Sequence, residues 1–445
     1  MRSLLMRSPI AIALFWIGTY LLITLLPLLI LLIYPPPAAR GFWVEFSVAL
    51  GFIGLAMMAL QFVLTARVRR IEASYGLDIL LQFHRLTSLA AFGMVLLHPI
   101  VLFAVEPETR QLLNFWEAPW RARLAILGTL AFVAMVITTI WRKPLHIPYE
   151  PWRTSHSVLS ILAMGLGLGH ALGVSYYLSL LWKEIIWTGM ALIVLWLIAY
   201  VRLIKPWMMI RKPYLVESVT PQRGNVWTLT LHPWGHDGFC FQPGQFSWLT
   251  LDTVPLSMRQ HPFSMSSNAE QAGRVEFSIK ALGDFTSTIK DVEPGTKAYV
   301  DGPYGVFTVD LYQDSAGFVL VAGGVGITPM MSILSTAAER KDSRPYLLIY
   351  ASKTWDDITF RDALEALKTQ LNLEIVYVLR EPPKNWLGEV GYVDKDLLAR
   401  HIPKQKATRH YFICASPVMM EQAERALHDL DVPVTQVHME HFNLA

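Results

Sequence analysis

The chain has 445 residues, of which 53% are hydrophobic and only 16% are charged, a composition too apolar for an ordinary soluble enzyme and typical of a membrane protein. The 38 Lys and Arg residues exceed the 35 Asp and Glu residues by three, and the absence of any dense basic run excludes nucleic-acid binding. Two cysteines, Cys240 and Cys414, are too few for a disulfide framework or an iron–sulfur centre.

Six segments within residues 1–205 are long and apolar enough to cross a hydrocarbon core of roughly 30 Å as helices. The predicted spans lie near residues 9–33, 42–64, 79–104, 122–141, 153–174 and 184–204. The first is too long for the core of a signal peptide, and prolines rather than a small-residue cleavage site follow it, so we expect it to be retained. The sequence therefore predicts a multi-pass membrane domain over residues 1–205.

Lys and Arg residues fall mainly on one side of these spans, which predicts that both termini face the cytoplasm of the cell's inner (plasma) membrane. That side carries Arg2, Arg7, Arg67, Arg69, Arg70, Arg142, Lys143, Arg202, Lys205, Arg211 and Lys212. The opposite side carries chiefly Arg40, Arg110, Arg121, Arg123 and Lys183.

Four histidines lie in two of the spans, His84 and His98 in the third and His156 and His170 in the fifth. Ionisable groups are costly there and point to function. Each pair is 14 residues apart, so both members face the same way on a helix, roughly 21 Å apart. The two helices run in the same direction, which places His84 level with His156 and His98 level with His170. Each level offers two imidazoles to one iron, as in a b-type haem.

Helix packing is the alternative interpretation, because a buried histidine can also bond a neighbouring helix. It does not explain four histidines at matched spacing. Small residues near the outer pair would let a flat macrocycle approach the backbone, although they also serve plain helix packing. These are Gly93, Gly165, Gly167 and Gly169. Arg85 and Arg153 are candidates for pairing with haem propionates or for anchoring at the interface.

After residue 205 the pattern changes to short alternating strands separated by Gly and Pro turns. Examples are residues 226–231, 246–251 and 275–280, which predict an antiparallel β-barrel over residues 213–310. Beyond it, strand-like runs alternate with helical ones and predict an α/β domain with a parallel sheet over residues 316–445. Its expected strands are 318–322, 345–351, 373–379 and 411–414, and its helices begin at Pro329 and near 360, 394 and 417. The predicted fold class is thus a six-helix all-α membrane bundle with a cytoplasmic β-barrel and an α/β domain.

A glycine-rich turn, Gly323-Gly324-Val325-Gly326-Ile327-Thr328-Pro329, follows an apolar strand and opens a helix. Glycines let a diphosphate approach the backbone, and the helix N-terminus supplies N–H donors and a favourable dipole. A plain tight turn is the alternative. The position at a strand-to-helix junction, with a proline in the first helical turn, favours dinucleotide binding.

An ordered set of motifs resembles the ferredoxin-NADP reductase-like module. In chain order it comprises His261-Pro262-Phe263-Ser264, Gly283-Asp284-Phe285-Thr286, Asp301-Gly302-Pro303-Tyr304-Gly305, the glycine-rich turn, Cys414-Ala415-Ser416-Pro417 and Glu440-His441-Phe442. Together with the four-histidine helical domain, essentially the whole chain resembles the ferric reductase and NADPH oxidase superfamily in its compact bacterial form.

The resemblance implies residue roles in an FAD site. His261 and Phe263, within the motif that includes Pro262, would hold FAD, and Ser264 would face the flavin ring. Gly283 and Thr286 would offer a backbone N–H and a hydroxyl to the diphosphate. Water-soluble reductases commonly have Arg at the position of His261, so the histidine favours the membrane branch.

The resemblance also implies a nicotinamide site. The turn residues Gly323, Gly324, Gly326, Thr328 and Pro329 would cradle the dinucleotide. Cys414 and Pro417 would border its nicotinamide end, and Phe442 would cover the flavin until nicotinamide displaces it. Ser264, Cys414 and Phe442 are therefore the predicted catalytic residues. A buried small hydrophobe at Cys414 and a core aromatic at Phe442 are the alternatives.

The implied function is electron transfer from cytoplasmic NAD(P)H through FAD and two b-type haems to an acceptor on the outer face. A flavin accepts a hydride and releases single electrons, which is why FAD stands between nicotinamide and haem. The acceptor is oxygen or a ferric complex. Superoxide-producing members often carry a further histidine where this chain has Leu102, which weakens the oxidase interpretation without excluding it.

Lys353 and Arg361 follow the second strand of the α/β domain. Their positive charges could meet the 2′-phosphate of NADPH, which favours NADPH over NADH. The alternative is that both side chains are ordinary solvated surface residues. No obligatory protein partner is evident. Two other functions stay open: a ferric-chelate reductase that does not reduce oxygen, and a non-enzymatic haem-bearing membrane module. The ordered motifs between His261 and Phe442 argue against the second.

Overall fold

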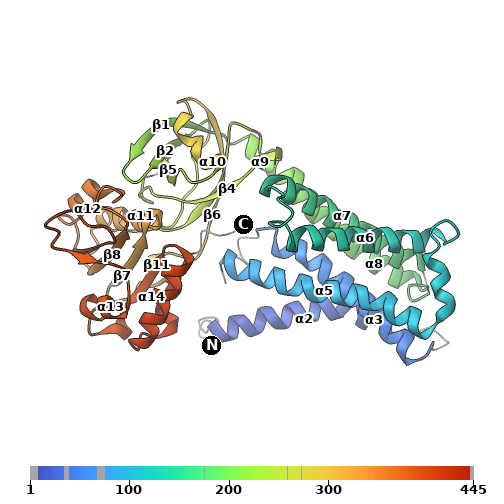
Figure 1. Cartoon of the computed structure of the whole chain (residues 1–445). Helices are drawn as coiled ribbons and strands as arrows, with labels where there is room; N and C mark the ends of the chain where they lie inside the picture. Colours follow the sequence, from blue (N-terminus) through green and yellow to red (C-terminus); the bar gives the residue numbers. More distant parts are fainter. Residues whose placement is uncertain are drawn as a thin grey trace. The chain divides into compact units, whose positions relative to one another are not determined.

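The computed structural model describes residues 9–34, 40–67, 76–174, 176–257, 259–271 and 273–440. The chain divides into two compact units between Lys205 and Pro206. Figure 1 shows the first unit as a group of long helices and the second as a sheet-rich body. This arrangement confirms the predicted fold class.

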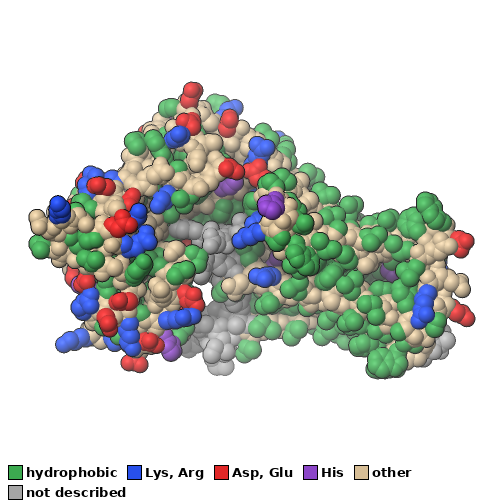
Figure 2. Space-filling view, in the orientation of Figure 1, with side chains coloured by type: hydrophobic (Ala, Val, Ile, Leu, Met, Phe, Trp, Pro, Cys, Tyr) green, Lys and Arg blue, Asp and Glu red, His purple; other side chains and the backbone are tan. Residues whose placement is uncertain are grey.

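The first unit is built from long apolar helices. They are α2 (Pro9–Leu32), α3 (Phe42–Leu64), α5 (Leu77–Val105), α6 (Trp120–Ile140), α7 (Tyr149–Val174) and α8 (Leu181–Ala199), with a 3₁₀-helix η1 (Pro107–Leu113), a π-helical turn η2 (Tyr200–Ile204) and a short helix α9 (Lys205–Ile210) that begins the connection to the second unit. Six of the described helices are long and apolar enough to cross a membrane. Hydrophobic side chains cover their outward faces (Figure 2), as expected for contact with lipid.

The helices pack most closely as two pairs, α3 with α5 and α6 with α7. Backbone contacts between α5 and α7, which carry the four histidines, are sparse. A buried cluster that includes Phe52, Met58, Phe132 and Met164 fills the space among α3, α6 and α7. Helices α5 and α7 are therefore each held by another helix and not by one another.

The second unit begins with a six-stranded antiparallel sheet in the order β4-β3-β6-β1-β2-β5. Its elements are β1 (Tyr214–Gln222), β2 (Val226–Pro233), β3 (Phe246–Leu251), β4 (His261–Ser264), β5 (Val275–Lys280), β6 (Lys297–Tyr304) and the short helix α10 (Asp284–Ser287). Alternating side chains of these strands form one buried cluster, with Leu229, Leu249 and Phe277 fully buried. The motif His261–Ser264 follows β3 along the chain and forms strand β4, which pairs with β3.

A six-stranded parallel sheet follows in the order β10-β9-β8-β7-β11-β12. Its strands are β7 (Phe318–Gly323), β8 (Tyr346–Ser352), β9 (Leu373–Leu379), β10 (Glu389–Val390), β11 (His410–Cys414) and β12 (Val437–Met439), and its helices are α11 (Ile327–Glu339), α12 (Arg361–Leu367), α13 (Lys395–His401) and α14 (Pro417–Asp429). Strand β7 is buried on both faces, which explains its unbroken apolar sequence. Helix α11 begins at Ile327, two residues before the predicted Pro329.

Helix α11 is joined to the barrel by polar residues at every fourth position. The Thr328 hydroxyl lies 2.8 Å from the Val325 carbonyl of its own turn and 3.3 Å from the Ser278 carbonyl of the barrel. The Ser332 hydroxyl donates to the Ser267 carbonyl (2.8 Å). Thr336 Oγ1 accepts the Ala269 amide (2.8 Å), and Arg340 pairs with Glu270 and Asp310. Residues four apart share one face of a helix. This polar seam, Thr328, Ser332, Thr336 and Arg340, attaches the barrel to the α/β domain.

Candidate functional site

The four histidines face one another in two pairs. The His84 and His156 ring centroids are 6.5 Å apart, and the His98 and His170 ring centroids are also 6.5 Å apart. Two metal–nitrogen bonds of about 2 Å place the centres of opposed imidazoles roughly 6 to 6.5 Å apart. Each pair therefore has the separation that one iron between two imidazoles requires.

Three of the four histidines have a hydrogen-bond partner at Nδ1. His98 Nδ1 lies 2.8 Å from the Ser47 carbonyl, and His170 Nδ1 lies 2.9 Å from the Arg121 carbonyl. His156 Nδ1 lies 3.1 Å from Thr139 Oγ1. An Nδ1–H that donates to such an acceptor leaves Nε2 as the basic nitrogen, the form that binds a metal. His84 Nδ1 is buried and has no hydrogen-bond partner among the described residues.

The glycines near the outer pair divide into two kinds. A Cβ at Gly167 or Gly169 would press on Leu55 or Leu124, at 3.0 and 2.9 Å, so these two glycines serve helix packing. A Cβ at Gly93 or Gly165 would meet nothing within 4 Å. The matched ring distances, the Nδ1 acceptors and the sparse contact between α5 and α7 fit two haems, one at each histidine level.

Sequence reasoning missed Ser47, Gly51, Thr139 and Arg202. A Cβ at Gly51 would lie 3.2 Å from the His98 ring, so α3 can approach the histidine only through a bare backbone. The Arg202 guanidinium donates to Ser157 Oγ at 2.8 Å, next to His156. Arg202 lies in the π-helical turn η2, a distortion frequent at functional sites. The sequence contained only a weak signal for this role of Arg202, because its position among other basic residues indicated membrane orientation and not a site.

The predicted flavin residues lie on β4 and α10. Ser264 is 4% exposed, and its Oγ has no hydrogen-bond partner among the described residues. The His261 ring stacks on Phe285 at 3.8 Å, and Phe263 lies parallel to Phe285 at 6.2 Å. An unsatisfied buried hydroxyl at the end of β4 and a set of parallel rings from β4 and α10 are the kinds of group that bind a flat polar heterocycle such as flavin. Phe285 is a further residue of this site that was not singled out from the sequence.

Gly283 and Thr286 contact each other in this structure. The Gly283 amide donates to Thr286 Oγ1 at 2.9 Å, as does the Leu282 amide at 3.0 Å, and the Thr286 hydroxyl donates to the Gly283 carbonyl. The hydroxyl thus caps the start of α10. The N–H and hydroxyl predicted to meet a diphosphate are engaged locally, so binding a diphosphate there requires exchange of these bonds.

The glycine-rich turn lies at the carboxyl ends of β7 and β11. A Cβ at Gly326 would lie 1.9 Å from the Cys414 carbonyl oxygen, and one at Gly323 would lie 2.7 Å from Ala415 Cβ. Only Gly324 has a positive φ, +55°, with open space around its Cβ position. The Thr328 hydroxyl, expected to touch the dinucleotide, instead belongs to the polar seam. Pro329 is buried in the first turn of α11.

The second predicted dinucleotide motif ends β11. Cys414 is fully buried, and Pro417 opens α14. The Glu440 amide donates to the Ile413 carbonyl at 3.2 Å, which brings the end of β12 beside Cys414. Phe442 lies outside the described residues.

The two cations expected at a 2′-phosphate have other contacts. Lys353 Nζ lies 3.5 Å from Glu381 Oε1, in a pair that is more than half exposed. The Arg361 guanidinium lies over the Trp355 ring at 4.6 Å and donates to the Trp355 carbonyl. Both side chains follow β8 as predicted, and Glu381 adds a negative charge beside Lys353.

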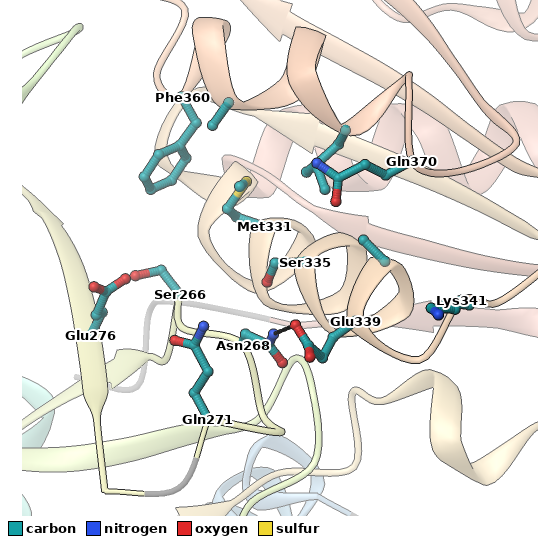
Figure 3. A pocket seen from close by; sticks show the side chains of 13 residues that line it. Ser266, Asn268, Gln271, Glu276, Met331, Ser335, Glu339, Lys341, Phe360 and Gln370 are labelled. Atoms are coloured by element: carbon teal, nitrogen blue, oxygen red, sulfur yellow. Dashed lines mark hydrogen bonds between the residues drawn. The ribbon is translucent and has the colours of Figure 1, made fainter.

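A cavity of about 520 Å³ lies between the barrel and helices α11 and α12 (Figure 3). Ser266 and Glu276 line it from the barrel, Met331 and Ser335 from α11, and Phe360 from the start of α12. None of its lining residues is a predicted cofactor residue. The cavity therefore lies apart from the candidate flavin and dinucleotide residues.

Two family models match parts of the chain, one in each unit. The family described as "Ferric reductase like transmembrane component" matches residues 50–167, and the "Oxidoreductase NAD-binding domain" family matches residues 320–425.

Individual curated relatives match about a third of the chain. NADH-cytochrome b5 reductase 1 of Debaryomyces hansenii is 31% identical over 36% of this chain and 58% of its own length. NADH–cytochrome b5 reductase 1 of Arabidopsis thaliana is 34% identical over 36% of this chain and 58% of its own length. The chain thus spans a little over half the length of these curated relatives. A flavohemoglobin from Malassezia yamatoensis aligns with a TM-score of 0.48 at 15% identity, over 89% of this chain and 96% of its own.

Proposed function

Because the chain has the domain architecture of the ferric reductase and NADPH oxidase superfamily, we propose that it carries electrons across a membrane, from NAD(P)H on the cytoplasmic side to a small-molecule acceptor on the outer face. The coarse function, an oxidoreductase with a multi-pass membrane component and an NAD(P)H and FAD reductase module, follows from that architecture. The observation that carries the finer proposal is the pair of opposed histidines at each of two levels, 6.5 Å apart in both.

In this proposal His84 and His156 hold an inner b-type haem, and His98 and His170 hold an outer one. Haem iron, when bound, accepts and releases single electrons. With two histidines holding each haem, the iron would have no open position for an acceptor, which would be reduced by outer-sphere electron transfer. Arg202, with Arg153 one turn before Ser157, supplies positive charge beside the inner pair for haem propionates.

On the reductase unit, His261, Phe263 and Phe285 supply the stacking faces for FAD, and the Ser264 hydroxyl meets the polar edge of the flavin. Gly324 gives the dinucleotide diphosphate access to the backbone, beside the amides that open α11. Cys414 and Pro417 border the nicotinamide. Phe442 covers the flavin when no nicotinamide is bound. Membrane orientation follows from the excess of Lys and Arg on the side of the reductase unit, which places both termini in the cytoplasm.

The proposal also concerns which dinucleotide donates the electrons and which acceptor receives them. Lys353 and Arg361 favour NADPH, whereas the Glu381 carboxylate beside Lys353 competes with a 2′-phosphate. The curated relatives are named for NADH. Oxygen and ferric complexes both remain acceptors in the proposal, since neither needs an open iron position.

The test is NAD(P)H oxidation by purified protein in liposomes, with oxygen and a membrane-impermeant ferric chelate supplied separately. Externally added NADPH or NADH should be oxidised only by molecules whose reductase unit faces the outside of the liposome. The acceptor inside the liposome should then be reduced. His98→Leu should abolish acceptor reduction and leave one haem reducible by NAD(P)H. His146→Leu, at an exposed histidine between α6 and α7, is the matched control and should retain both haems. Protein without bound haem would contradict the proposal, whereas protein with haem but no flavin would favour the non-enzymatic haem-bearing module.

A further inference from the structure

The two histidine pairs differ in what holds their Nδ1 atoms. At the outer level both partners are backbone carbonyls, Ser47 for His98 and Arg121 for His170, at 2.8 and 2.9 Å. At the inner level the described partner is one hydroxyl, Thr139 at 3.1 Å from His156, and none is found for His84 among the described residues.

The hydrogen bonds around Thr139 assign its role. Its hydroxyl donates to the Met135 carbonyl at 2.7 Å, so the remaining contacts of Thr139 Oγ1 are made through lone pairs. Those lone pairs face His156 Nδ1 at 3.1 Å and Trp152 Nε1 at 3.3 Å, and both nitrogens must donate. His156 therefore carries its proton on Nδ1 and presents an unprotonated Nε2 to His84.

Ser47 acts on His98 in the same sense but more strongly. The Ser47 hydroxyl donates to the His98 carbonyl at 2.8 Å, which leaves its lone pairs for His98 Nδ1 at 3.1 Å. The Nδ1 proton is thus shared between the carbonyl and the hydroxyl of one serine, while Gly51 allows α3 to lie against the ring. His98 has two acceptors and His156 has one.

A hydrogen bond from Nδ1–H to an acceptor raises the basicity of a ligating imidazole, and a more basic ligand stabilises the more highly charged ferric iron. At the outer level the acceptors include backbone carbonyls, which no substitution removes, whereas the acceptor of His156 is a side chain.

Resting on the proposed function, we propose that Thr139 is a positioning residue for the inner haem. By accepting a hydrogen bond from the Nδ1 proton of His156 it leaves Nε2 free for the iron, and it lowers the reduction potential of that haem.

The test is a spectroelectrochemical titration of the purified full-length protein, with Thr139→Val compared with Thr138→Val. Thr138 is the matched control because, among the described residues, its hydroxyl bonds to the Ala134 and Met135 carbonyls and to no histidine. Thr139→Val should raise the potential of the inner haem, which is the component that remains in His98→Leu. The expected change is up to about tenfold in its reduced-to-oxidised ratio at fixed potential, or about 59 mV for one electron. Thr139→Ser should restore the wild-type value, and Thr138→Val should leave both potentials unchanged.

His98→Leu identifies the inner component independently of Thr139, because it should remove the outer haem alone. A shift of only the other component in Thr139→Val, or no shift with both haems retained, would overturn the role of Thr139. Wild-type protein without haem would instead contradict the proposed function itself.

Discussion

Two glycines of the dinucleotide turn are needed for different physical reasons. Gly326 lets the start of α11 lie against the end of β11, because a Cβ there would fall 1.9 Å from the Cys414 carbonyl oxygen. Gly324 has φ +55°, and the space around its Cβ position is open. Gly326 therefore serves packing, whereas Gly324 keeps the backbone accessible to a ligand.

This difference predicts opposite profiles for two alanine variants. Gly326→Ala should lower the free energy of unfolding by about 1 to 3 kcal/mol or more, because the backbone must move to relieve the clash. Gly324→Ala should cost about 1 to 2 kcal/mol from left-handed strain and should weaken NADP⁺ binding more than Gly326→Ala does. Thermal unfolding and NADP⁺ titrations of the full chain measure both. An unchanged melting temperature in Gly326→Ala would contradict the packing role.

Removing the Ser264 hydroxyl should stabilise the protein without flavin and weaken its binding of flavin. The buried hydroxyl lacks a partner among the described residues, so Ser264→Ala should stabilise flavin-free protein by about 1 kcal/mol. The same variant should bind FAD about threefold to tenfold more weakly, the value of one lost hydrogen bond. Ser266→Ala is the control, because Ser266 Oγ bonds Ser278 Oγ at 3.0 Å and its loss should destabilise flavin-free protein. Lower stability of flavin-free Ser264→Ala would contradict the assignment.

Strand β12 carries a ring stack that joins it to the rest of the sheet. His438 Nε2 lies 2.9 Å from His410 Nδ1, and Tyr312 Oη lies 3.2 Å from His438 Nδ1. The Tyr312 ring stacks on both histidines, at 4.0 and 4.3 Å. Burial lowers the pKa of His438 to about 4, with the nearby His410 adding to the shift, and burial also lowers the pKa of His410.

These pKa values predict loss of stability in acid. A histidine whose folded pKa lies below its unfolded value near 6.5 binds its proton more readily in the unfolded chain, so its contribution is full above pH 6.5 and falls toward pH 4. The loss from His438 is at most about 3 kcal/mol. Urea unfolding between pH 4.5 and 7.5 should show a flatter profile for His438→Gln than for His428→Gln, whose side chain is 75% exposed. Equal slopes in the two variants would refute this origin.

At the scale of elements, long periodic segments could be predicted and short paired ones could not. The spanning helices and strands such as β7 and β9 carry their own apolar patterns, so sequence reasoning found them within a few residues. Strand β12 has only three residues, and its conformation comes from pairing with β11. The four histidines could be selected by spacing alone. Their partners could not, because Ser47, Arg121 and Thr139 approach them only through helix packing.

At the scale of the molecule, the second unit contains its own cores and complete sheets. Every described strand pairs within the unit, and the buried clusters of the barrel and of the parallel sheet draw on no residue before Tyr214. Residues 213–445 should therefore fold without the helices, bind FAD and pass electrons from NAD(P)H to a soluble dye. A folded fragment that neither binds flavin nor reduces the dye with FAD added would count against the proposed reductase site.

The polar seam on α11 determines how the joint between barrel and α/β domain responds to temperature. Its contacts are hydrogen bonds and ion pairs, and exposing polar surface lowers heat capacity whereas exposing apolar surface raises it. Breaking these polar contacts therefore adds little to the large positive heat-capacity change that accompanies melting of either sheet. Hydrophobic contacts, such as that of Ile333 with the barrel, weaken on cooling, whereas the hydrogen bonds of the seam do not depend on them. These hydrogen bonds should thus keep the two candidate cofactor sites aligned in the cold as well as at growth temperature.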